Sequence, residues 1–287
     1  MSEARAALGL DVVIGFGEEL RHLHHPAPAP EPGASTLALH DGYPHTPFEP
    51  TAGATQSFLI AGNYALADQL RAGGRLGVSV ANNVAAFDRS LHAVAAISNL
   101  EVEIERELLL EEDTELSLGL GIALPTAQGA DLETGRSSAL STLQGLVQEA
   151  AAAARGFEDG ALFETARLGI IPKLRVSHRA RSMRLESYVK LENLLSTRST
   201  SARRYLGELI MSGFYGYELL RIITLGVRVW SSIVLDDATA AALLCEPQVR
   251  VRAGALNATL GVLLPIVSRF AEPAVASGMR LAASAPF

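Results

Sequence analysis

Hydrophobic and polar residues alternate one by one in two neighbouring stretches between positions 98 and 124. The first stretch sets an apolar series against an acidic one, formed by Leu100, Val102 and Ile104 and by Glu101, Glu103 and Glu105. The second follows the polar turn at 111–114 and alternates apolar residues from Leu116 to Leu124 with small or polar ones. Successive side chains of a β-strand point to opposite faces, so the pattern predicts a β-hairpin with one apolar face.

The same alternation recurs along most of the chain. It predicts about twelve strands, over residues 8–16, 57–66, 70–80, 98–105, 116–124, 166–179, 184–192, 205–215, 223–230, 243–252, 256–264 and 275–287. Long connections follow the first, third and fifth strands, and tight turns lie between them. An even strand number with this asymmetry is typical of bacterial membrane barrels, which place the short turns at the periplasmic end. Both termini are expected at that end.

Two long connections, 21–54 and 125–161, interrupt the alternation. Residues 21–54 contain seven prolines, which exclude regular sheet or helix. Within 125–161, apolar residues at three- and four-residue steps predict a helix over 137–155, with Gly156 as its terminator. We expect this helix, in an extracellular loop, to pack over the barrel rim, and insertion into the barrel mouth is the alternative. Residues 81–94 are expected to form a loop.

Alternation alone fits both a soluble β-sandwich and a transmembrane barrel, and composition favours the barrel. Hydrophobic residues make up 48% of the chain and the mean hydropathy is +0.22. The sequence has no apolar run long enough for a transmembrane helix, and a barrel hides its membrane signal in alternation. The net charge of −7 argues against a nucleic-acid partner. A single cysteine, Cys245, excludes an intramolecular disulfide and a cysteine-based zinc site.

The end of the chain adds a family signal. The last strand carries apolar residues at alternate positions and ends in Phe287, and similar alternation marks segments such as 98–103, 116–126, 246–250 and 260–265. In these features the chain resembles the bacterial outer-membrane β-barrel superfamily, in its porin-like branch. The resemblance implies one domain over 1–287, an outer-membrane location in contact with the lipid bilayer, and no cofactor. It also implies that barrel-assembly machinery is a partner, with Phe287 as the assembly signal. Because no signal peptide is visible, we expect the sequence to be a mature form with an added start Met.

Charged residues on the inferred inner face are the candidate functional residues. They are Glu101, Glu103, Glu105, Arg167, Lys173, Arg175, Arg179, Arg184, Glu186, Lys190, Glu192, Arg228, Arg250, Arg252 and Arg280. One hypothesis is that they line an aqueous pore for small hydrophilic solutes or ions and set its selectivity, as charged rings do in channels. The basic excess favours anionic solutes. The alternative is that they pair across a narrow lumen and seal it, which makes the barrel purely structural.

Three alternatives have less support in the sequence: a metal site, an enzyme and a soluble β-sandwich. Five histidines, His22, His24, His25, His40 and His45, lie in the first long loop without regular ligand spacing, so we expect a solvated loop and no metal site. A lipase-like barrel enzyme needs a serine beside a histidine base. Ser177 and His178 point to opposite faces of one strand, and His92 lies in a loop near Ser90, so no enzyme is expected. A soluble β-sandwich would bury the apolar residues between two sheets.

Overall fold

The chain folds as an antiparallel β-barrel in the computed structural model, which describes residues 6–17, 53–85, 91–111, 113–129, 139–198, 204–219, 222–235, 241–267 and 277–286. The strands are β1 (Ala6–Gly17), β2 (Gly53–Ala67), β3 (Leu70–Ala85), β4 (Leu91–Ile97), β5 (Leu100–Leu110), β6 (Thr114–Leu124), β7 (Arg167–Ala180), β8 (Met183–Ser196), β9 (Tyr205–Leu219), β10 (Ile223–Val234), β11 (Ala241–Ala253), β12 (Leu256–Val267) and β13 (Ser277–Pro286). Two helices, α1 (Ala139–Ala154) and α2 (Gly160–Phe163), lie between β6 and β7.

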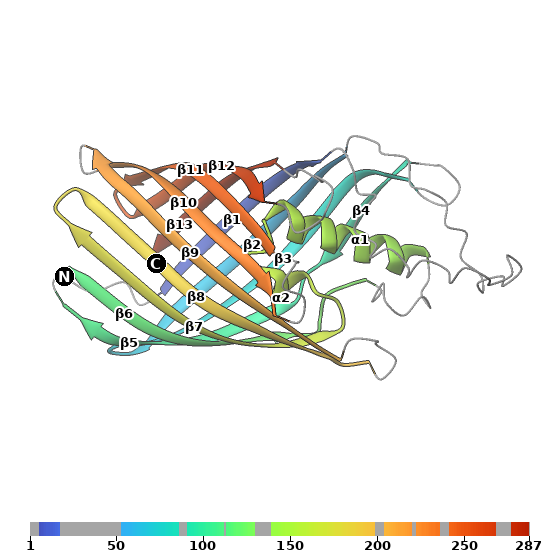
Figure 1. The fold of residues 1–287 in the computed structure, drawn as a ribbon, viewed down its shortest axis with the longest axis horizontal. Helices are drawn as coiled ribbons and strands as arrows, with labels where there is room; N and C mark the ends of the chain where they lie inside the picture. Colours follow the sequence, from blue (N-terminus) through green and yellow to red (C-terminus); the bar gives the residue numbers. More distant parts are fainter. Residues whose placement is uncertain are drawn as a thin grey trace, which may run out of the picture.

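Closure comes from β1, which pairs with β13 on one side and β2 on the other (Figure 1). The remaining strands pair with their sequence neighbours, except that β3 pairs with both β4 and β5. The wall is therefore a closed barrel of twelve strands, and a thirteenth strand is additional to it. The prediction of an all-β, up-and-down barrel of about twelve strands is confirmed.

The extra strand corrects the prediction that residues 81–94 form a loop. β3 continues to Ala85, and its upper part, from Val78 to Ala85, pairs with β4, whereas its lower part pairs with β5. β4 and β5 thus follow each other along one edge of β3. They are two parts of one long strand, interrupted at Ser98 and Asn99. The register of β3 with β4 shifts between Ala81 and Val84. Because of this shift, hydrophobic and polar residues in 81–94 do not alternate regularly, and the sequence pattern does not indicate a strand there.

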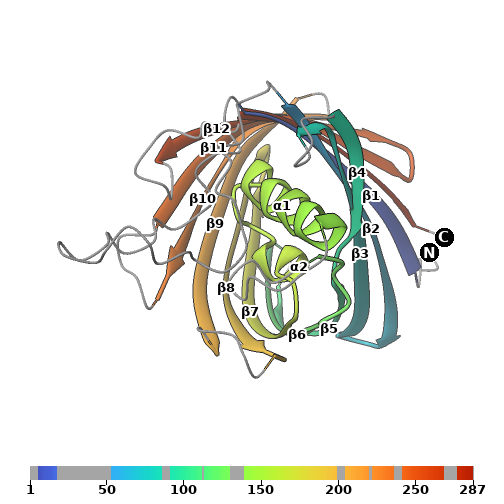
Figure 2. The ribbon, with the colours of Figure 1, turned by 90° about the vertical axis from the view of Figure 1, so that its right-hand side faces the viewer.

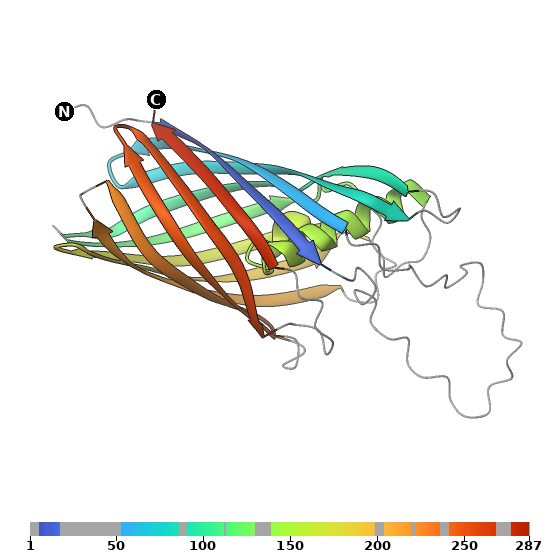
Figure 3. The same cartoon turned by 90° about the horizontal axis from the view of Figure 1, so that it is seen from above.

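The two ends of the barrel differ in their connections. β1 begins where β13 ends, since Ala7 pairs with Pro286. The tight turns at 68–69, 181–182 and 254–255 lie at this same end, and the connection carrying α1 and α2 starts from the other (Figure 3). Gly254 adopts a φ of +63°, which a tight hairpin turn requires and glycine allows without steric cost. The predicted asymmetry of the connections therefore exists in the part of the chain that the structure describes.

The outer surface of the barrel is apolar. Leu118, Val227 and Leu281 are 50%, 43% and 55% exposed on it, whereas Glu192 and Glu246 are fully buried in the interior. A soluble protein seldom exposes so continuous an apolar surface, and a membrane barrel presents it to lipid. The soluble β-sandwich is thus rejected, because it would bury these side chains between two sheets.

The two helices lie inside the barrel (Figure 2). α1 runs from the long-connection end into the lumen and packs against β1, β2, β3 and β4, and α2 packs beside β8. The expectation of a helix over the rim is therefore wrong, and the alternative of insertion is correct. We call residues 139–163 the inserted segment. Among the described residues, no helix has the length and apolarity needed to cross a membrane.

Candidate functional site

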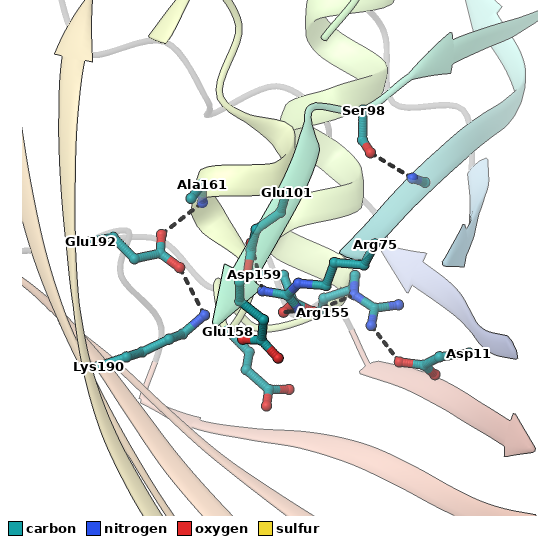
Figure 4. Close-up of polar contacts among 12 residues, drawn as sticks. Asp11, Arg75, Ser98, Glu101, Arg155, Glu158, Asp159, Ala161, Lys190 and Glu192 are labelled. Atoms are coloured by element: carbon teal, nitrogen blue, oxygen red, sulfur yellow. Dashed lines mark hydrogen bonds and ion pairs between the residues drawn. The ribbon is translucent and has the colours of Figure 1, made fainter. Parts of the chain in front are cut away.

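The inserted segment reverses direction at a glycine. After α1 ends at Ala154, Gly156 adopts a φ of +64°; its N–H donates to the carbonyl of Ala153, and the N–H of Phe157 donates to the carbonyl of Ala152. This pair of hydrogen bonds is the Schellman motif, which ends helices at glycine. Gly156 is therefore the helix terminator that the sequence predicts. The reversal leaves Arg155, Glu158 and Asp159 at the tip of the segment, within the lumen (Figure 4).

Arg155 connects the tip to β1 and β2. Its side chain is 2% exposed and donates from Nη2 to Oδ2 of Asp11 at 2.5 Å and from Nε to Oδ2 of Asp159 at 2.9 Å. A third donor, Nη1, lies 3.3 Å from Oγ of Ser57. Arginine offers several fixed donors, which suits it to a buried site between two carboxylates. All three sides of this guanidinium are thus used to fix the tip.

Asp159 extends the same network to β3 and β5. Its Oδ1 accepts from Nη1 of Arg75 at 2.5 Å, and Nη2 of Arg75 donates to Oε2 of Glu101 at 2.9 Å. Burial raises the pKa of Asp159, but the Arg75 and Arg155 charges outweigh it and hold the pKa well below its usual range. The carboxylate is therefore ionised at neutral pH, and the charges alternate from β1 across the tip to β5.

Glu158 binds three other strands of the wall, β8, β10 and β13. Its Oε2 accepts from Nη1 of Arg280 at 3.1 Å and forms an ion pair with Arg228, and its Oε1 accepts from the hydroxyl of Tyr188. Burial raises the pKa of Glu158, but the Arg228 and Arg280 charges more than offset this and lower it to about 2. Arg280 also donates to Asp11 at 2.7 Å, so the two sides of the tip share one network.

α2 is held by uncharged and charged partners. Asn99, fully buried at the break between β4 and β5, donates from Nδ2 to the carbonyls of Ala161 and Glu164 at 2.8 and 2.7 Å. On the other side, the N–H of Ala161 donates to Oε2 of Glu192 at 2.6 Å, and Lys190 donates to Oε1 of the same carboxylate at 2.8 Å. The strand break therefore supplies an anchor that a regular strand residue could not provide.

Small residues let α1 approach the wall closely. A Cβ on Gly15 would lie 2.4 Å from the Cβ of Ala154, which is far inside van der Waals contact. The glycines that the alternation places on the inner face of the first strand thus have a packing function. Trp230, the single tryptophan, is buried beside Ala154 and donates from Nε1 to the carbonyl of Gly156 at 3.1 Å.

A cavity of about 280 Å³ lies beside the tip. Its walls are the tip carboxylates and inward side chains of β3, β5 and β7 to β11. The lining residues are Arg75, Glu101, Glu103, Glu158, Asp159, Ile171, Lys173, Arg175, Glu186, Ser187, Tyr188, Lys190, Ser212, Phe214, Arg228 and Arg250. Most are charged, so the space suits water and polar solutes.

The structure brings most of the sequence-predicted charges together in the lumen. Eight of them line this cavity: Glu101, Glu103, Lys173, Arg175, Glu186, Lys190, Arg228 and Arg250. Three more lie beside it or beside the tip: Glu105 is 3.6 Å from Lys173, Glu192 holds α2, and Arg280 holds Glu158. Arg184 pairs with Glu186 at 2.5 Å.

Three predicted residues lie apart from the cavity. Arg167 is buried at the start of β7 and lies 3.5 Å from Glu164, at the base of the inserted segment. Arg179 pairs with Glu218 at 2.6 Å, and Arg252 donates to Asn257 at 3.3 Å. The last two are exposed and lie near the tight turns, so they belong to the mouth at that end.

Sequence reasoning missed five residues that hold the tip: Asp11, Arg75, Arg155, Glu158 and Asp159. Asp11 is the one charge among glycines and valine on the inner face of its strand, which was a usable signal. Three charges within five residues directly after an alanine-rich helix were a second signal. Neither can be interpreted until the helix is known to enter the lumen.

Several predictions fall outside the described residues. Phe287, the five histidines of the first long loop, residues 18–52 and the side chain of His92 belong to this group. His178 is described: its Nδ1 lies 2.9 Å from Oγ1 of Thr114 on the exposed face, so its hydrogen-bond partner is a threonine of the next strand.

Comparisons with known proteins agree with this architecture. No family model matches the sequence, and no curated protein matches it either. The crystal structure of the COG4313 outer membrane channel from Pseudomonas putida F1 superposes with a TM-score of 0.63 at 9% identity, covering 100% of this chain and 97% of that one. The KdgM porin covers 97% of this chain and 99% of its own, at 8% identity and a TM-score of 0.47.

An enzyme also appears among the similar structures. LpxR from Salmonella typhimurium has 12% identity and a TM-score of 0.44, and the alignment covers 98% of this chain and all of that one. Identities this low relate the folds alone. The chain therefore shares its fold with the COG4313 outer membrane channel, and this fold is the β-barrel that the sequence predicts.

Proposed function

We propose that this protein is an outer-membrane channel for small hydrophilic solutes or ions, and that the inserted segment constricts its lumen. The observation that carries the proposal is the charged lumen beside the tip, where a cavity of about 280 Å³ is lined mainly by ionised side chains. Charged linings attract and select hydrated solutes in channels. The apolar outer surface fits a lipid bilayer, and the tight turns would face the periplasm.

The charges of the lumen support passage better than a permanent seal. A small barrel that serves only as a scaffold is filled by side chains from its own wall. Here a separate segment fills the lumen, and ion pairs and hydrogen bonds hold it at its tip. Water can hydrogen-bond the charged groups of the tip once they separate, whereas α1 residues such as Leu143 and Val147 are buried against the wall, where water replaces apolar packing poorly. We infer that the segment can yield part of the lumen to a solute.

A catalytic role has less support. In the described residues the candidate base His178 bonds Thr114 on the outer face, away from Ser177. The lumen is instead dense in paired charges. We also propose that barrel-assembly machinery reads the chain's C-terminal residue Phe287, as the sequence resemblance implies.

Current recordings in planar bilayers test the function. The folded protein should give unitary current steps, and replacing residues 139–163 with a short Gly-Ser linker should increase the unitary conductance several-fold. A control variant with residues 236–240 replaced by the same linker should match the unmodified protein. Absence of current steps from both the unmodified protein and the 139–163 variant, each shown to be folded by its gel shift on boiling, would exclude the channel.

A further inference from the structure

Arg175 differs from the other cations around the cavity. Its side chain is exposed to the cavity from the middle of β7. Among the described residues it has neither an ion pair nor a hydrogen bond within the usual distances. Its cross-strand neighbours are Ser117 and Tyr188, and neither carries charge at neutral pH. Arg175 is therefore a guanidinium with free donors that faces a solvent-filled space.

The acids around the cavity already have partners. Glu101 and Asp159 pair with Arg75, Glu103 pairs with Lys173, and Glu158 pairs with Arg228. Glu186, the remaining acid, lies 2.5 Å from Arg184 and 3.0 Å from Arg250. Lys190 pairs with Glu192 outside the cavity. After these pairings Arg175 is the one cavity cation without an ion pair in the described part of the chain: Glu186 acts on it electrostatically but already pairs with Arg184 and Arg250. The cavity thus favours a ligand with a single negative charge.

The walls indicate what else the ligand should carry. Ile171 and Phe214 add apolar surface, and the ring of Phe214 is fixed by Arg250, whose guanidinium carbon lies 3.6 Å from the ring centre. Ser212, on the inner face of β9, supplies a hydroxyl group. The volume of about 280 Å³ is at the lower limit of sites for drug-sized ligands, so the ligand must be small. A dianion would be repelled by Glu103 and Glu186, because Arg175 is the one described cation of the cavity without an ion pair.

We propose that this cavity is a binding subsite for a small organic monocarboxylate, whose carboxylate is held by the two-pronged guanidinium of Arg175. Arginine binds carboxylates through two parallel hydrogen bonds, a geometry that lysine does not offer. The organic part of the ligand lies against Ile171 and Phe214. The inference rests on the proposed channel function. It names the class of solute that binds in the lumen during passage.

Fluorine NMR tests the subsite with 4-fluorobenzoate as the probe and 4-fluorobenzamide as its neutral counterpart. The folded protein in detergent micelles should bind 4-fluorobenzoate saturably, with empty micelles as the blank. R175Q should weaken this binding by about tenfold or more, since a charge-assisted hydrogen-bond pair is lost. R175K should give an intermediate value. Binding of 4-fluorobenzamide should be the same in all variants.

R252Q is the matched control. It removes one positive charge from an arginine that lies near the tight turns and outside the cavity, so 4-fluorobenzoate should bind it as it binds the unmodified protein. Equal affinity in R175Q and the unmodified protein, or no saturable binding to either, would overturn the subsite. Ion currents distinguish the two proposals. Unitary currents without Arg175-dependent binding of 4-fluorobenzoate would support the channel and overturn the subsite. Arg175-dependent binding without unitary currents would overturn the channel alone.

Discussion

Arg155, directly after α1, places Nη2 at 2.5 Å from Oδ2 of Asp11 on β1, 144 positions away in the sequence. The pair joins the inserted segment to the first strand of the wall, in the interior of the barrel. Arg280, on the last strand, donates to the same Asp11 oxygen at 2.7 Å. The two strands that close the barrel, β1 and β13, therefore both contribute to holding the tip. Barrel closure and docking of the segment are coupled through one carboxylate.

R155Q should loosen the inserted segment and leave the barrel intact. Removing one member of a buried ion pair leaves its partner poorly compensated and costs about 3–5 kcal/mol. Asp11 keeps Arg280 and Asp159 keeps Arg75, so the lower end of this range is expected, about 3 kcal/mol. Hydrogen exchange followed by mass spectrometry should show faster exchange in residues 139–163 and unchanged exchange in β8 to β12. R252Q serves as the control, and unchanged exchange of the segment in R155Q would contradict the docking role.

Docking should persist down to acidic pH. The pKa of Glu158 is lowered from its ordinary 4.5 to about 2 in the docked state, so its ionised form stabilises docking. The sign follows from linkage: the contribution is complete above pH 4.5 and is lost as the pH falls toward about 2. The difference corresponds to roughly 3 kcal/mol.

Trp230 reports this transition, because it is the single tryptophan and bonds Gly156 at the tip. Its emission should stay constant from pH 7 to pH 5 and move to longer wavelength only between about pH 4.5 and 2. E158Q should show a smaller acid step, because Asp159, whose pKa is also lowered in the docked state, still contributes to it. A complete shift above pH 5 would show that the tip carboxylates do not control docking.

Gly15 offers a steric test with a matched control in the same strand. In G15A the new Cβ would lie 2.4 Å from the Cβ of Ala154, so α1 must move. In G9A the nearest atom to the new Cβ is at 3.6 Å, an ordinary contact. G15A should therefore shift Trp230 emission and raise the exchange of 139–163, and G9A should do neither. Identical behaviour of the two variants would contradict the close packing of α1 on β1.

If the apolar outer surface faces lipid, the destabilisation caused by a charged substitution should depend on its depth in the bilayer. Leu120, on β6, lies in the middle of the apolar band, and Leu108, on β5, lies near the turn at 111–113; both are exposed. L120R should lower the free energy of unfolding in lipid vesicles by about 2–4 kcal/mol, and L108R by about 0–1 kcal/mol. Urea unfolding in vesicles measures both. An equal, negligible cost for the two variants would mean that this surface does not face acyl chains.

The fold could be predicted because its signal is local. Alternation in segments such as 116–124 arises because each strand has one lipid face and one lumen face. It can therefore be recognised in the sequence even when the partner of each strand is unknown. The interruption at Ser98 and Asn99 could not be predicted, since both residues continue the alternation in sequence. Only the register of β3 with β4 and β5 reveals the break. α2 could not be predicted either, because a helix of four residues is too short to show a helical repeat of apolar residues.

The candidate site was predictable on the wall and not in the inserted segment. Lys173, Arg175 and Lys190 follow from strand alternation, and they line the cavity as inner-face residues. The position of α1 depends on long-range pairs such as Arg155 with Asp11, and no sequence pattern reports a contact over that separation. The general expectation that long loops lie outside the scaffold therefore led to the wrong prediction that the helix packs over the rim.

Ion flow past Arg175 tests the central claim most directly. In a C245S background, R175C places a thiol in the cavity and L118C places one on the apolar surface. A charged, membrane-impermeant methanethiosulfonate reagent should change the unitary current of R175C in a single step and leave that of L118C unchanged. Currents that respond to the reagent in neither variant, with attachment to the introduced thiol of R175C verified by mass spectrometry, would contradict a conducting path through this lumen.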